Sequence, residues 1–392
     1  AAMLADGVAD ANEGIAAEER LWFLRLLRDT GGEGRIFYRR RADNPGRKAG
    51  NIEDFLTRSG GAYDYALILD ADSLMEGETI VEMVRRMEAD PRLGLLQTLP
   101  KVIRARARFG RAQQFSAAAF APVFARGQAV MQGHAGPFWG HNALVRVAAF
   151  AQACGLPSLP GPAPFGGPIL SHDYVEAAML ARAGWTVRLD EDLEGSFEEG
   201  PETLIDHAKR DRRWCQGNLQ HAGLIGARGL RPWSRFTFFQ GIFAYLAPLF
   251  WLAFLALSIL AAITAPLHPD YFLPENPIPV FPIDMTGKAV ALGFGIFGLL
   301  FLPKLLIALD AIRTGRAAGF GGPVAMLRGT LAEVMLSSVT APIFLMFQTR
   351  SVCQVLMGYD GGWPPQTRAG GRLALAASWA ATWWMVAAGA AG

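Results

Sequence analysis

Two aspartates, Asp70 and Asp72, follow a run of residues that has the composition of a buried strand, in the stretch YALILDADSLMEG. Hard divalent cations such as Mg²⁺ and Mn²⁺ prefer carboxylate oxygens, and two acids separated by one residue at a strand end can supply them. Two solvated acids in a surface turn would give the same pattern. The pair therefore predicts a cation site only in the company of other motifs.

Two further stretches carry groups suited to binding an anion. In RKAGNIEDFL, Lys48 and Asn51 stand beside a tight turn at the start of a predicted helix, where an ammonium group and backbone N–H groups could hold a phosphate or a ribose. In KRDRRWCQGN, Arg210 and Arg213 precede Trp214, a combination that could clamp a diphosphate and stack on a sugar. The alternatives are a capped surface helix and a basic stretch that holds anionic lipid.

A candidate base and two candidate sugar-binding stretches complete the set. The stretch ILSHDYVEAAML places Asp173 near the start of a predicted helix, where a carboxylate can act as N-cap, as general base, or as both. His172 beside it has the simpler alternative of a polar neighbour in a loop. FWGHNALVR supplies Trp139 and His141, an aromatic and a polar side chain of the kind that hold sugar hydroxyls, or else an ordinary loop into a strand.

These residues are carried by alternating predicted strands and helices. In chain order, the residue types predict strand 35–40, helix 50–60, strand 65–70, helix 79–90 and strand 93–100. A βαβαβ order implies a largely parallel sheet flanked by helices, with ligands at the carboxyl ends of the strands. Asp70 and Asp72 lie at such an end.

The second part of the chain has the composition of a membrane protein. Residues 1–235 have the pattern of a soluble α/β domain, whereas 236–392 contain nearly uncharged runs long enough for the ~20 apolar residues that a span requires. Residues 330–357 are either a span or an interfacial helix. Arginines flank the first two spans, so the positive-inside rule places the α/β domain in the cytosol. Spans are predicted at about 237–264, 289–309 and 373–392.

Charge and cysteine content exclude other classes of protein. A formal net charge of +2 with 18% charged residues argues against a nucleic-acid partner, which would call for a large basic face. The three cysteines have no paired spacing and predict neither a disulfide framework nor a zinc site.

The order of the motifs resembles that of the processive membrane glycosyltransferases of family 2. In that family a strand-end D-x-D, an aspartate at a helix start and an R-W helix follow one another and lead into a transmembrane span. Over roughly residues 4–365, the chain is similar to the branch that makes the linear β-1,2-linked backbone of osmoregulated periplasmic glucans. The stretches that carry this resemblance are GGEGRIFYRRR, RKAGNIEDF, LDADSLM, FWGHNALVR, ILSHDYVEAAML and KRDRRWCQGNL.

The resemblance implies a fold and a role for each motif residue. The fold would be GT-A, with a Rossmann-like and mostly parallel sheet, followed by an α-helical transmembrane region. Asp70 and Asp72 would hold Mg²⁺ or Mn²⁺, and Asp173 would deprotonate the acceptor hydroxyl. The residues implied in binding nucleotide and diphosphate are Asp6, Lys48, Asn51, Arg210 and Arg213. The residues implied in binding the acceptor are Trp214, Trp139, His141 and His172. Arg210 stands where other members carry glutamine, so we do not transfer the role of that glutamine.

The implied activity is an inverting transfer of glucose from UDP-glucose to a growing glucan, coupled to export. The implied location is the bacterial inner membrane, multi-pass and in contact with membrane lipid, with a periplasmic glucan-processing protein as an expected partner and no nucleic acid. We expect the chain to be a fragment without the family's upstream strand and N-terminal membrane segments. Two alternatives stay open: another family 2 synthase with a β-1,3 or β-1,4 product, and a non-catalytic membrane-anchored protein that binds sugar nucleotides.

Overall fold

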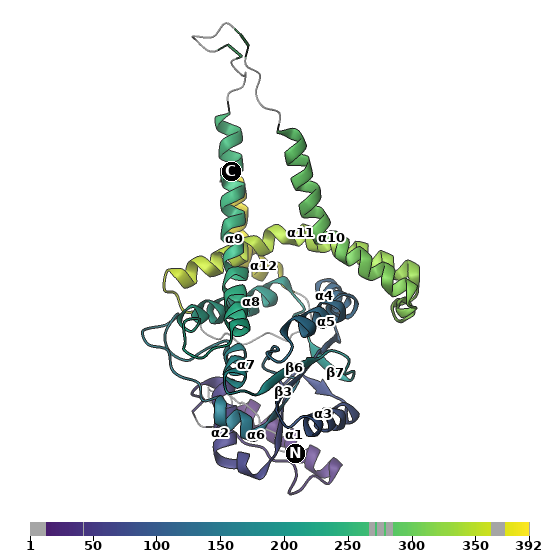
Figure 1. The fold of residues 1–392 in the computed structure, drawn as a ribbon, viewed down its shortest axis with the longest axis vertical. Coiled ribbons are helices and arrows are strands. Elements are labelled where there is room, and N and C mark those ends of the chain that lie inside the picture. Colours follow the sequence, from purple (N-terminus) through teal and green to yellow (C-terminus); the bar gives the residue numbers. More distant parts are fainter. Residues whose placement is uncertain are drawn as a thin grey trace.

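The first half of the chain forms an α/β domain, and the long helices of the second half rise from this domain or lie across its top (Figure 1). This computed structural model describes residues 13–41, 43–265, 271–272, 278–279, 285–361 and 373–391. The predicted fold class, α/β followed by a helical region, is confirmed.

A four-stranded sheet forms the centre of the domain, in the order β1 (Tyr65–Ile68), β5 (Ala143–Arg146), β3 (Leu93–Thr98) and β6 (Thr186–Asp190). β1, β3 and β6 run in one direction, whereas β5 runs against both of its neighbours. The position at which β5 begins explains why it runs in the opposite direction. The Asn142 carbonyl accepts a hydrogen bond from the Thr98 N–H (3.2 Å), so the chain enters the sheet where β3 ends and must run back. The sheet is therefore mixed rather than largely parallel.

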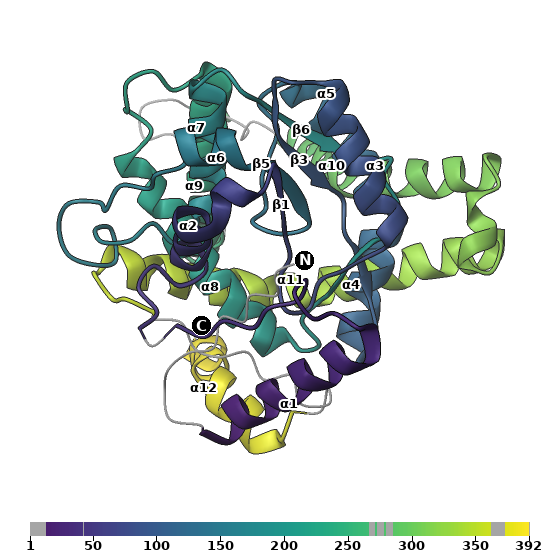
Figure 2. The same cartoon turned by 90° about the horizontal axis from the view of Figure 1, so that it is seen from below.

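Helices cover both faces of this sheet, which explains why all six residues of β3 are buried. The helices of the domain are α1 (Glu13–Thr30), α2 (Arg47–Ser59), α3 (Gly77–Ala89), α4 (Arg108–Ala119), α5 (Ala121–Gln132), α6 (Val147–Ala153), α7 (His172–Arg182) and α8 (Leu204–Gln220). Leu95 packs with residues of α6 and α7, and Leu96 packs with residues of α3, as alternation along a strand requires. Figure 2 shows α2, α6 and α7 on one side of the strands and α3 on the other.

A smaller sheet lies beside the carboxyl ends of β1 and β3. Its order is β2 (Leu74–Met75), β7 (Ser196–Glu199) and β4 (Lys101–Ile103), with β7 antiparallel to β2 and parallel to β4. These strands have two to four residues each, too few to produce a periodicity from which they could be predicted.

The strand predicted at residues 35–40 is wrong, because this segment belongs to neither of the described sheets. The Ile36 N–H donates to the Gly32 carbonyl (2.9 Å) and closes a turn. Arg39 is drawn to α2, where it forms an ion pair with Asp54. These side-chain and turn contacts hold the segment against a helix instead of a strand.

Among the described residues, three helices are long and apolar enough to cross a membrane: α9 (Pro232–Thr264), α10 (Thr286–Arg313) and α11 (Pro323–Leu356). The spans predicted at 237–264 and 289–309 fall within α9 and α10. The third predicted span, 373–392, overlaps α12 (Leu375–Ala391), which is not one of these three helices, so this span stays a prediction.

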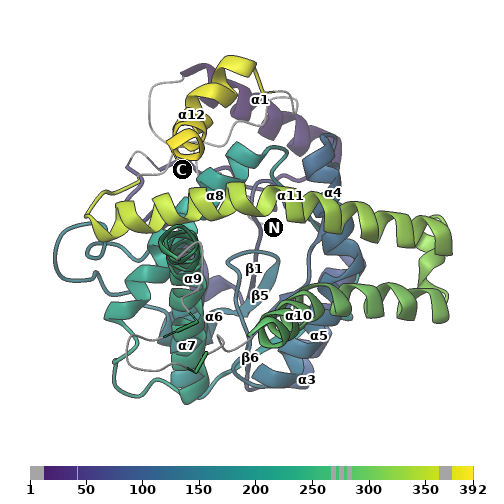
Figure 3. The same ribbon diagram turned by 90° about the horizontal axis from the view of Figure 1, so that it is seen from above.

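α11 differs from α9 in direction. In Figure 1, α9 and the first part of α10 stand upright on the domain, whereas α11 lies across its top, and Figure 3 shows the same crossing from above. α10 bends along its length, and its interior Pro303 removes a backbone hydrogen bond and favours such a kink.

α8 joins the domain to these helices. Cys215 of α8 packs with Val352 of α11 in a buried cluster. Tyr245 of α9 donates a hydrogen bond from its hydroxyl to Asp211 Oδ1 of α8 (3.0 Å). The helix that carries the R-W motif is thus fixed both to the first apolar helix and to the helix that lies across it.

An ion pair connects α10 with α11. Lys304 Nζ lies 2.7 Å from Glu333 Oε2, and both side chains are largely buried. The ammonium group also lies 5.5 Å from the ring centroid of Phe120, which stands between α4 and α5. The pair therefore sits where the helical region meets the α/β domain.

Candidate active site

The turn after β1 holds the two aspartates of the D-x-D pattern. The Asp70 N–H donates to Ser73 Oγ (3.1 Å), and the Ser73 N–H donates to the Asp70 carbonyl (3.0 Å), which closes a tight turn. Lys48, in the first turn of α2, forms an ion pair with the Asp70 carboxylate. The fold therefore brings Lys48 to the D-x-D turn across a separation of 22 positions.

Asn51 has a different environment from the one predicted. It is buried in α2, and both its side-chain oxygen and its carbonyl accept hydrogen bonds from the guanidinium of Arg39. Its oxygen thus holds Arg39 against α2, and its contact with a nucleotide stays a prediction. Asp6 lies outside the described residues.

A buried hydrogen-bond network fixes the loop before β5, which carries Trp139 and His141. Gln97 Oε1 accepts a bond from the Trp139 N–H (3.0 Å), and Gln97 Nε2 donates to the His141 carbonyl (3.0 Å). Asn142 Nδ2 donates to Ser196 Oγ of β7 (2.8 Å). Because Gln97 and Asn142 are 0% exposed, losing one of these bonds would leave a buried polar group unpaired. The loop is therefore held rigidly.

Asp173 lies in the first turn of α7, and Ser171 rather than Asp173 is the N-cap residue. The positive end of the helix dipole favours a charged carboxylate at this place. Gly140 faces it: a Cβ at position 140 would lie 3.5 Å from Asp173 Oδ2, and the φ of +85° at Gly140 suits glycine. The candidate base thus borders the loop that carries Trp139 and His141.

The end of α8 holds the segment that leads into α7. Gln220 Oε1 accepts a hydrogen bond from the Leu170 N–H (3.0 Å), and His221 Nε2 lies 3.1 Å from the Ser171 carbonyl. Gly217 approaches so closely that a Cβ there would come within 2.2 Å of Ser171 Oγ. Two motifs that are distant in the sequence, SHD and RDRRWC, are fixed to each other in this way.

Arg210 and Arg213 of α8 form a partly buried cluster of positive charge. Burial lowers the pKa of Arg213, and the charges of Arg210 and Arg47 lower it further. The Arg210 guanidinium lies 4.6 Å from the ring centroid of Trp214, whose side chain is half exposed. Such a cluster favours an anionic ligand, because an anion relieves the repulsion between the cations. The exposed ring offers a surface on which a sugar can stack.

Both predicted histidines lie against carboxylates. His172 Nδ1 is 3.1 Å from Glu176 Oε2, and Glu176 is fully buried. Burial opposes protonation of His172, but the Glu176 carboxylate outweighs it and raises the pKa of His172. His141 Nε2 is 3.4 Å from Glu198 Oε2 of β7. Because His172 faces the interior, its contact with an acceptor stays a prediction.

The D-x-D turn offers carboxylate oxygens to a cation, and the rest of a coordination sphere would have to come from elsewhere. Within the described part of the chain, no group of three His, Cys, Asp or Glu side chains is placed to hold a metal ion. Mg²⁺ is commonly bound through one or two carboxylates, with substrate phosphates and water as further ligands. Asp70 and Asp72 fit a site of this shared kind.

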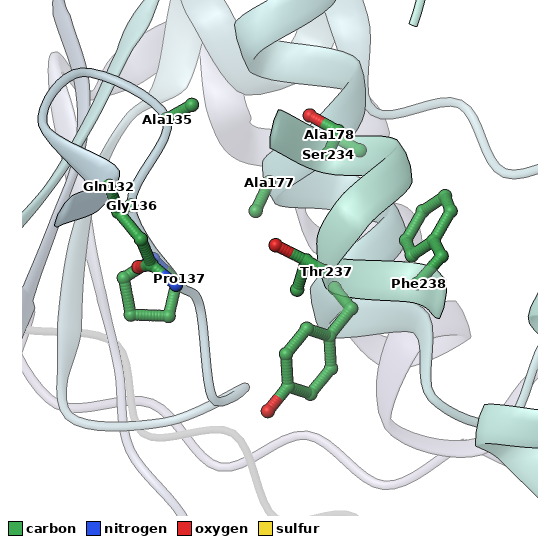
Figure 4. Close-up of a pocket in the computed structure, with 10 residues that line it drawn as sticks. Gln132, Ala135, Gly136, Pro137, Ala177, Ala178, Ser234, Thr237 and Phe238 are labelled. Atoms are coloured by element: carbon green, nitrogen blue, oxygen red, sulfur yellow. The ribbon is translucent and has the colours of Figure 1, made fainter. Parts of the chain in front are cut away.

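The candidate base lies close to the first apolar helix. Val175 and Ala178 of α7 pack with Phe238 of α9, and a small open pocket lies between these two helices and the loop before β5 (Figure 4). Its lining includes Tyr174, which follows Asp173, together with Ser234 and Thr237 of α9 and Pro137 of the loop before β5 (Figure 4). The helix that carries the candidate base therefore borders the start of α9.

The end of α11 returns to α8. Arg212 Nη2 donates to the Tyr359 carbonyl (2.8 Å), and Gln216 Nε2 donates to Asp360 Oδ1 (2.9 Å). The residues after α11 are thus seated on the same helix as Arg213 and Trp214.

Glu198 and Gln97 are not among the site residues predicted from the sequence. A signal for Glu198 exists in the stretch SFEEG, since two adjacent residues of a strand point to opposite faces and one glutamate must face inward. Nothing in the stretch says which. For Gln97, a single polar residue in a buried strand is a signal, because such a group requires hydrogen-bond partners.

Comparison with known proteins places the chain in a family. Residues 65–302 match the family described as glycosyl transferase family group 2. The chain is 67% identical, over 97% of its length, to a protein named glucans biosynthesis glucosyltransferase H from Cereibacter sphaeroides, of which it spans 64%. Proteins of the same name from Rhodopseudomonas palustris and Vibrio cholerae are 47% and 43% identical over 87% and 93% of the chain, which spans 48% and 51% of them.

The chain thus spans about half to two thirds of the length of these curated relatives. The family match covers more than half of the chain and includes the D-x-D turn, Asp173 and the R-W helix. The chain belongs to glycosyl transferase family group 2.

Proposed function

We propose that the chain carries the active site of an inverting glucosyltransferase that uses UDP-glucose to extend a linear β-1,2-linked glucan. One observation carries the proposal: Asp173 faces Gly140, while α8, with Arg213 and Trp214, is fixed to the residues that precede Asp173. A base, a cation cluster and an aromatic surface at one place suit transfer from a nucleotide sugar. The names of the relatives support a glucosyl donor and a glucan product.

In this reaction Asp173 accepts the proton of the acceptor hydroxyl. As the acceptor oxygen forms a bond to C1 of glucose, the bond from C1 to the oxygen of UDP breaks, and its electron pair leaves with UDP. This single displacement inverts the configuration at C1 and converts an α-linked donor into a β-linked product. One base is sufficient, because no covalent glycosyl-enzyme forms.

The cationic residues act on the leaving group. Arg210 and Arg213 stabilise the negative charge that develops on the diphosphate of UDP. Asp70 and Asp72 would hold Mg²⁺ or Mn²⁺, and a bound cation supplies further neutralisation of that charge. Lys48 keeps the Asp70 carboxylate in place through its ion pair.

The acceptor side is formed by the loop before β5 and by α8. Trp139 and His141 border Asp173 through Gly140, and Trp214 offers its half-exposed ring to the end of the acceptor. In this proposal Asn51, Asp6 and His172 keep the roles that the family resemblance implies.

We place the domain on the cytosolic side of the bacterial inner membrane, with α9 and α10 as spans. The apolar, outward-facing surface of α9 supports this, as does the distribution of arginines around the two helices. The crosswise direction of α11 favours an interfacial position for residues 330–357 over a span. Export of the glucan past these helices, contact with lipid and a periplasmic glucan-processing partner belong to the same proposal.

The test uses membranes from cells that express the complete gene, supplied with radiolabelled UDP-glucose. We expect incorporation into polymer, loss of incorporation when divalent cations are chelated, and a decrease of at least about a hundredfold in Asp173→Asn. UDP binding should persist in Asp173→Asn, which controls for folding. Full activity of this variant would refute the role of the base, and absence of incorporation by the wild type would refute the function.

Linkage analysis of the polymer tests the product separately. We expect 2-linked glucosyl residues. A 3-linked or 4-linked polymer would refute the β-1,2 assignment and leave the transfer reaction standing.

A further inference from the structure

Three arginines at the start of α4 have exposed side chains that pair with no carboxylate among the described residues. Arg106 precedes the helix, whereas Arg108 and Arg111 lie at its beginning. Arg104 differs from them, because it forms an ion pair with Glu199 (3.3 Å). The positive charges of Arg106, Arg108 and Arg111 are therefore available to a ligand from outside.

Glu202 fixes the backbone that carries these arginines. Its two carboxylate oxygens accept hydrogen bonds from the N–H groups of Arg106 (2.9 Å) and Ala107 (2.7 Å). Gly110 packs against the same carboxylate, since a Cβ there would lie 2.7 Å from Glu202 Oε2. One carboxylate beside three cations leaves a net positive charge, and the fold itself sets the place of that charge.

α4 packs along α11, the helix that lies across the top of the domain. The ring of Phe109 lies 6.2 Å from the ring of Phe344, centroid to centroid. Further along α4, Phe115 meets Gly329, where a Cβ would come within 2.6 Å of the ring. Figure 1 shows α4 just beneath α11, at the end of the domain from which α9 rises.

Two of the arginines lie on the side of α4 that contacts α11. Arg108 and Arg111 stand seven and four positions before Phe115, and residues at these spacings share one face of a helix. Because Phe115 contacts α11, this face of α4 borders α11. The arginines therefore lie beside the crosswise helix.

The opposite side of α11 is apolar and exposed. Val324, Leu331, Met335 and Val339 are each at least 60% exposed, and their spacings of seven, four and four place them on one stripe. Gly329, which contacts α4, lies well away from this stripe on the helix. An interfacial helix buries such a stripe among the lipid head groups and acyl chains. Packed helices have axes ~8–10 Å apart, so arginines on α4 can reach up to the head groups.

We propose that Arg106, Arg108 and Arg111 bind the phosphate groups of anionic phospholipids in the cytosolic leaflet. This inference rests on the membrane placement proposed above, and it adds the class of lipid and the residues that recognise it. An acidic soluble protein would match the charge of the arginines, but it would leave the apolar stripe of α11 in water. A bilayer with anionic head groups covers both features.

The experiment measures the melting temperature of the purified complete protein in neutral detergent, as dioleoylphosphatidylglycerol or dioleoylphosphatidylcholine is added. A lipid that binds the folded protein raises this temperature, and the midpoint of the titration gives its apparent affinity. The test variant is Arg108→Gln/Arg111→Gln. The matched control, Arg85→Gln/Arg92→Gln, removes two exposed charges at the end of α3, far below α11 in Figure 1.

We expect phosphatidylglycerol to stabilise the wild type and the control at the same midpoint, and phosphatidylcholine to have a weaker effect. In Arg108→Gln/Arg111→Gln the affinity for phosphatidylglycerol should fall about 25-fold, or about fivefold for each arginine. The preference of the wild type for phosphatidylglycerol should also decrease as NaCl rises from ~0.05 M to ~0.5 M, because salt screens exposed charges.

Equal midpoints for the wild type and Arg108→Gln/Arg111→Gln would overturn the inference. A wild type without preference for phosphatidylglycerol would also overturn it and would leave an acidic protein as the ligand. If the variant shows no cooperative unfolding in the absence of lipid, the salt series on the wild type decides, and a preference insensitive to salt would overturn the inference. Recovery of the complete protein in the soluble fraction without detergent would refute the membrane placement instead.

Discussion

Replacement of Gly140 by alanine probes the contact between the candidate base, Asp173, and the loop before β5. A Cβ at this position lies 3.5 Å from both Cβ and Oδ2 of Asp173, which is ordinary van der Waals contact without a clash. The methyl group therefore fits, but it occupies space at the outer surface of the carboxylate. In the proposed transfer, an acceptor hydroxyl comes within hydrogen-bond distance of the same oxygen.

Two effects of Gly140→Ala can be estimated. The backbone of Gly140 has a φ of +85°, where an L-residue costs roughly 1–2 kcal/mol in stability. If the methyl group moves the acceptor by about 1 Å, the rate of transfer falls about a hundredfold, or ~2.7 kcal/mol in the activation barrier. UDP binding should change little, because in the proposed function the diphosphate binds to Arg210, Arg213 and the D-x-D turn and not to Gly140.

Gly184→Ala is the matched control. Gly184 follows the last turn of α7, at the far end of the helix that carries Asp173. Its φ is +94°, and nothing lies within 4 Å of a Cβ built there. The control therefore carries the same backbone cost without a contact at the site. Melting temperature, UDP affinity and kcat are measured on both variants in detergent.

We expect both variants to lose similar stability and only Gly140→Ala to lose turnover. Full turnover in Gly140→Ala would show that the acceptor does not pass between Gly140 and Asp173. Equal losses of turnover in the two variants would show that backbone strain, and not the methyl group at the site, causes the effect.

Two further predictions concern ion pairs away from the site. Arg86 forms ion pairs with both Asp190 (2.7 Å) and Asp192 (2.8 Å). Arg86→Met should therefore lower the free energy of unfolding by about 1.5–3 kcal/mol. We expect a value near the lower limit, because Asp192 is well exposed. Through its hydrogen bond Arg86 lowers the pKa of Asp192, so the stability that this pair contributes is complete above pH 3.8, the ordinary value, and disappears as the pH falls through the lowered pKa. Thermal unfolding of the wild type and Arg86→Met between pH 7 and pH 3 checks this. A difference in stability between the two proteins that stays constant over this range would contradict it. Lys304→Met leaves the buried Glu333 without its partner and should destabilise the protein by about 3–5 kcal/mol, whereas the double variant Lys304→Met/Glu333→Leu should recover most of the loss in melting temperature. If Lys304→Met/Glu333→Leu were no more stable than Lys304→Met, the unpaired charge of Glu333 would not be the cause of the loss.

Several features of the fold follow from local residue types. The apolar run before Asp70 forms β1, and the helices predicted at 50–60 and 79–90 match α2 and α3 within the usual uncertainty at their ends. The apolar runs of the second half form α9 and α10. These predictions succeed because hydrophobic periodicity and length act within a short window of sequence.

Other features depend on which segments meet. β5 has a composition suited to either direction, and its antiparallel pairing is decided by its point of entry beside Thr98. Asn51 reads as a ligand of a nucleotide, yet Arg39 occupies its oxygen. In each case a partner elsewhere in the chain decides the outcome.

The sequence by itself determined the class of the fold, the D-x-D turn at the end of β1, the position of Asp173 at a helix start, and the apolar helices. Only the tertiary structure decided that Gly140 faces Asp173, that Glu198 rather than Glu199 turns inward, and that α11 lies across α9. The physical reason is the range of the interactions. Residue types and their spacing act locally, whereas the buried network that joins Gln97, Asn142 and Ser196 exists only when strands about fifty to a hundred positions apart pack together.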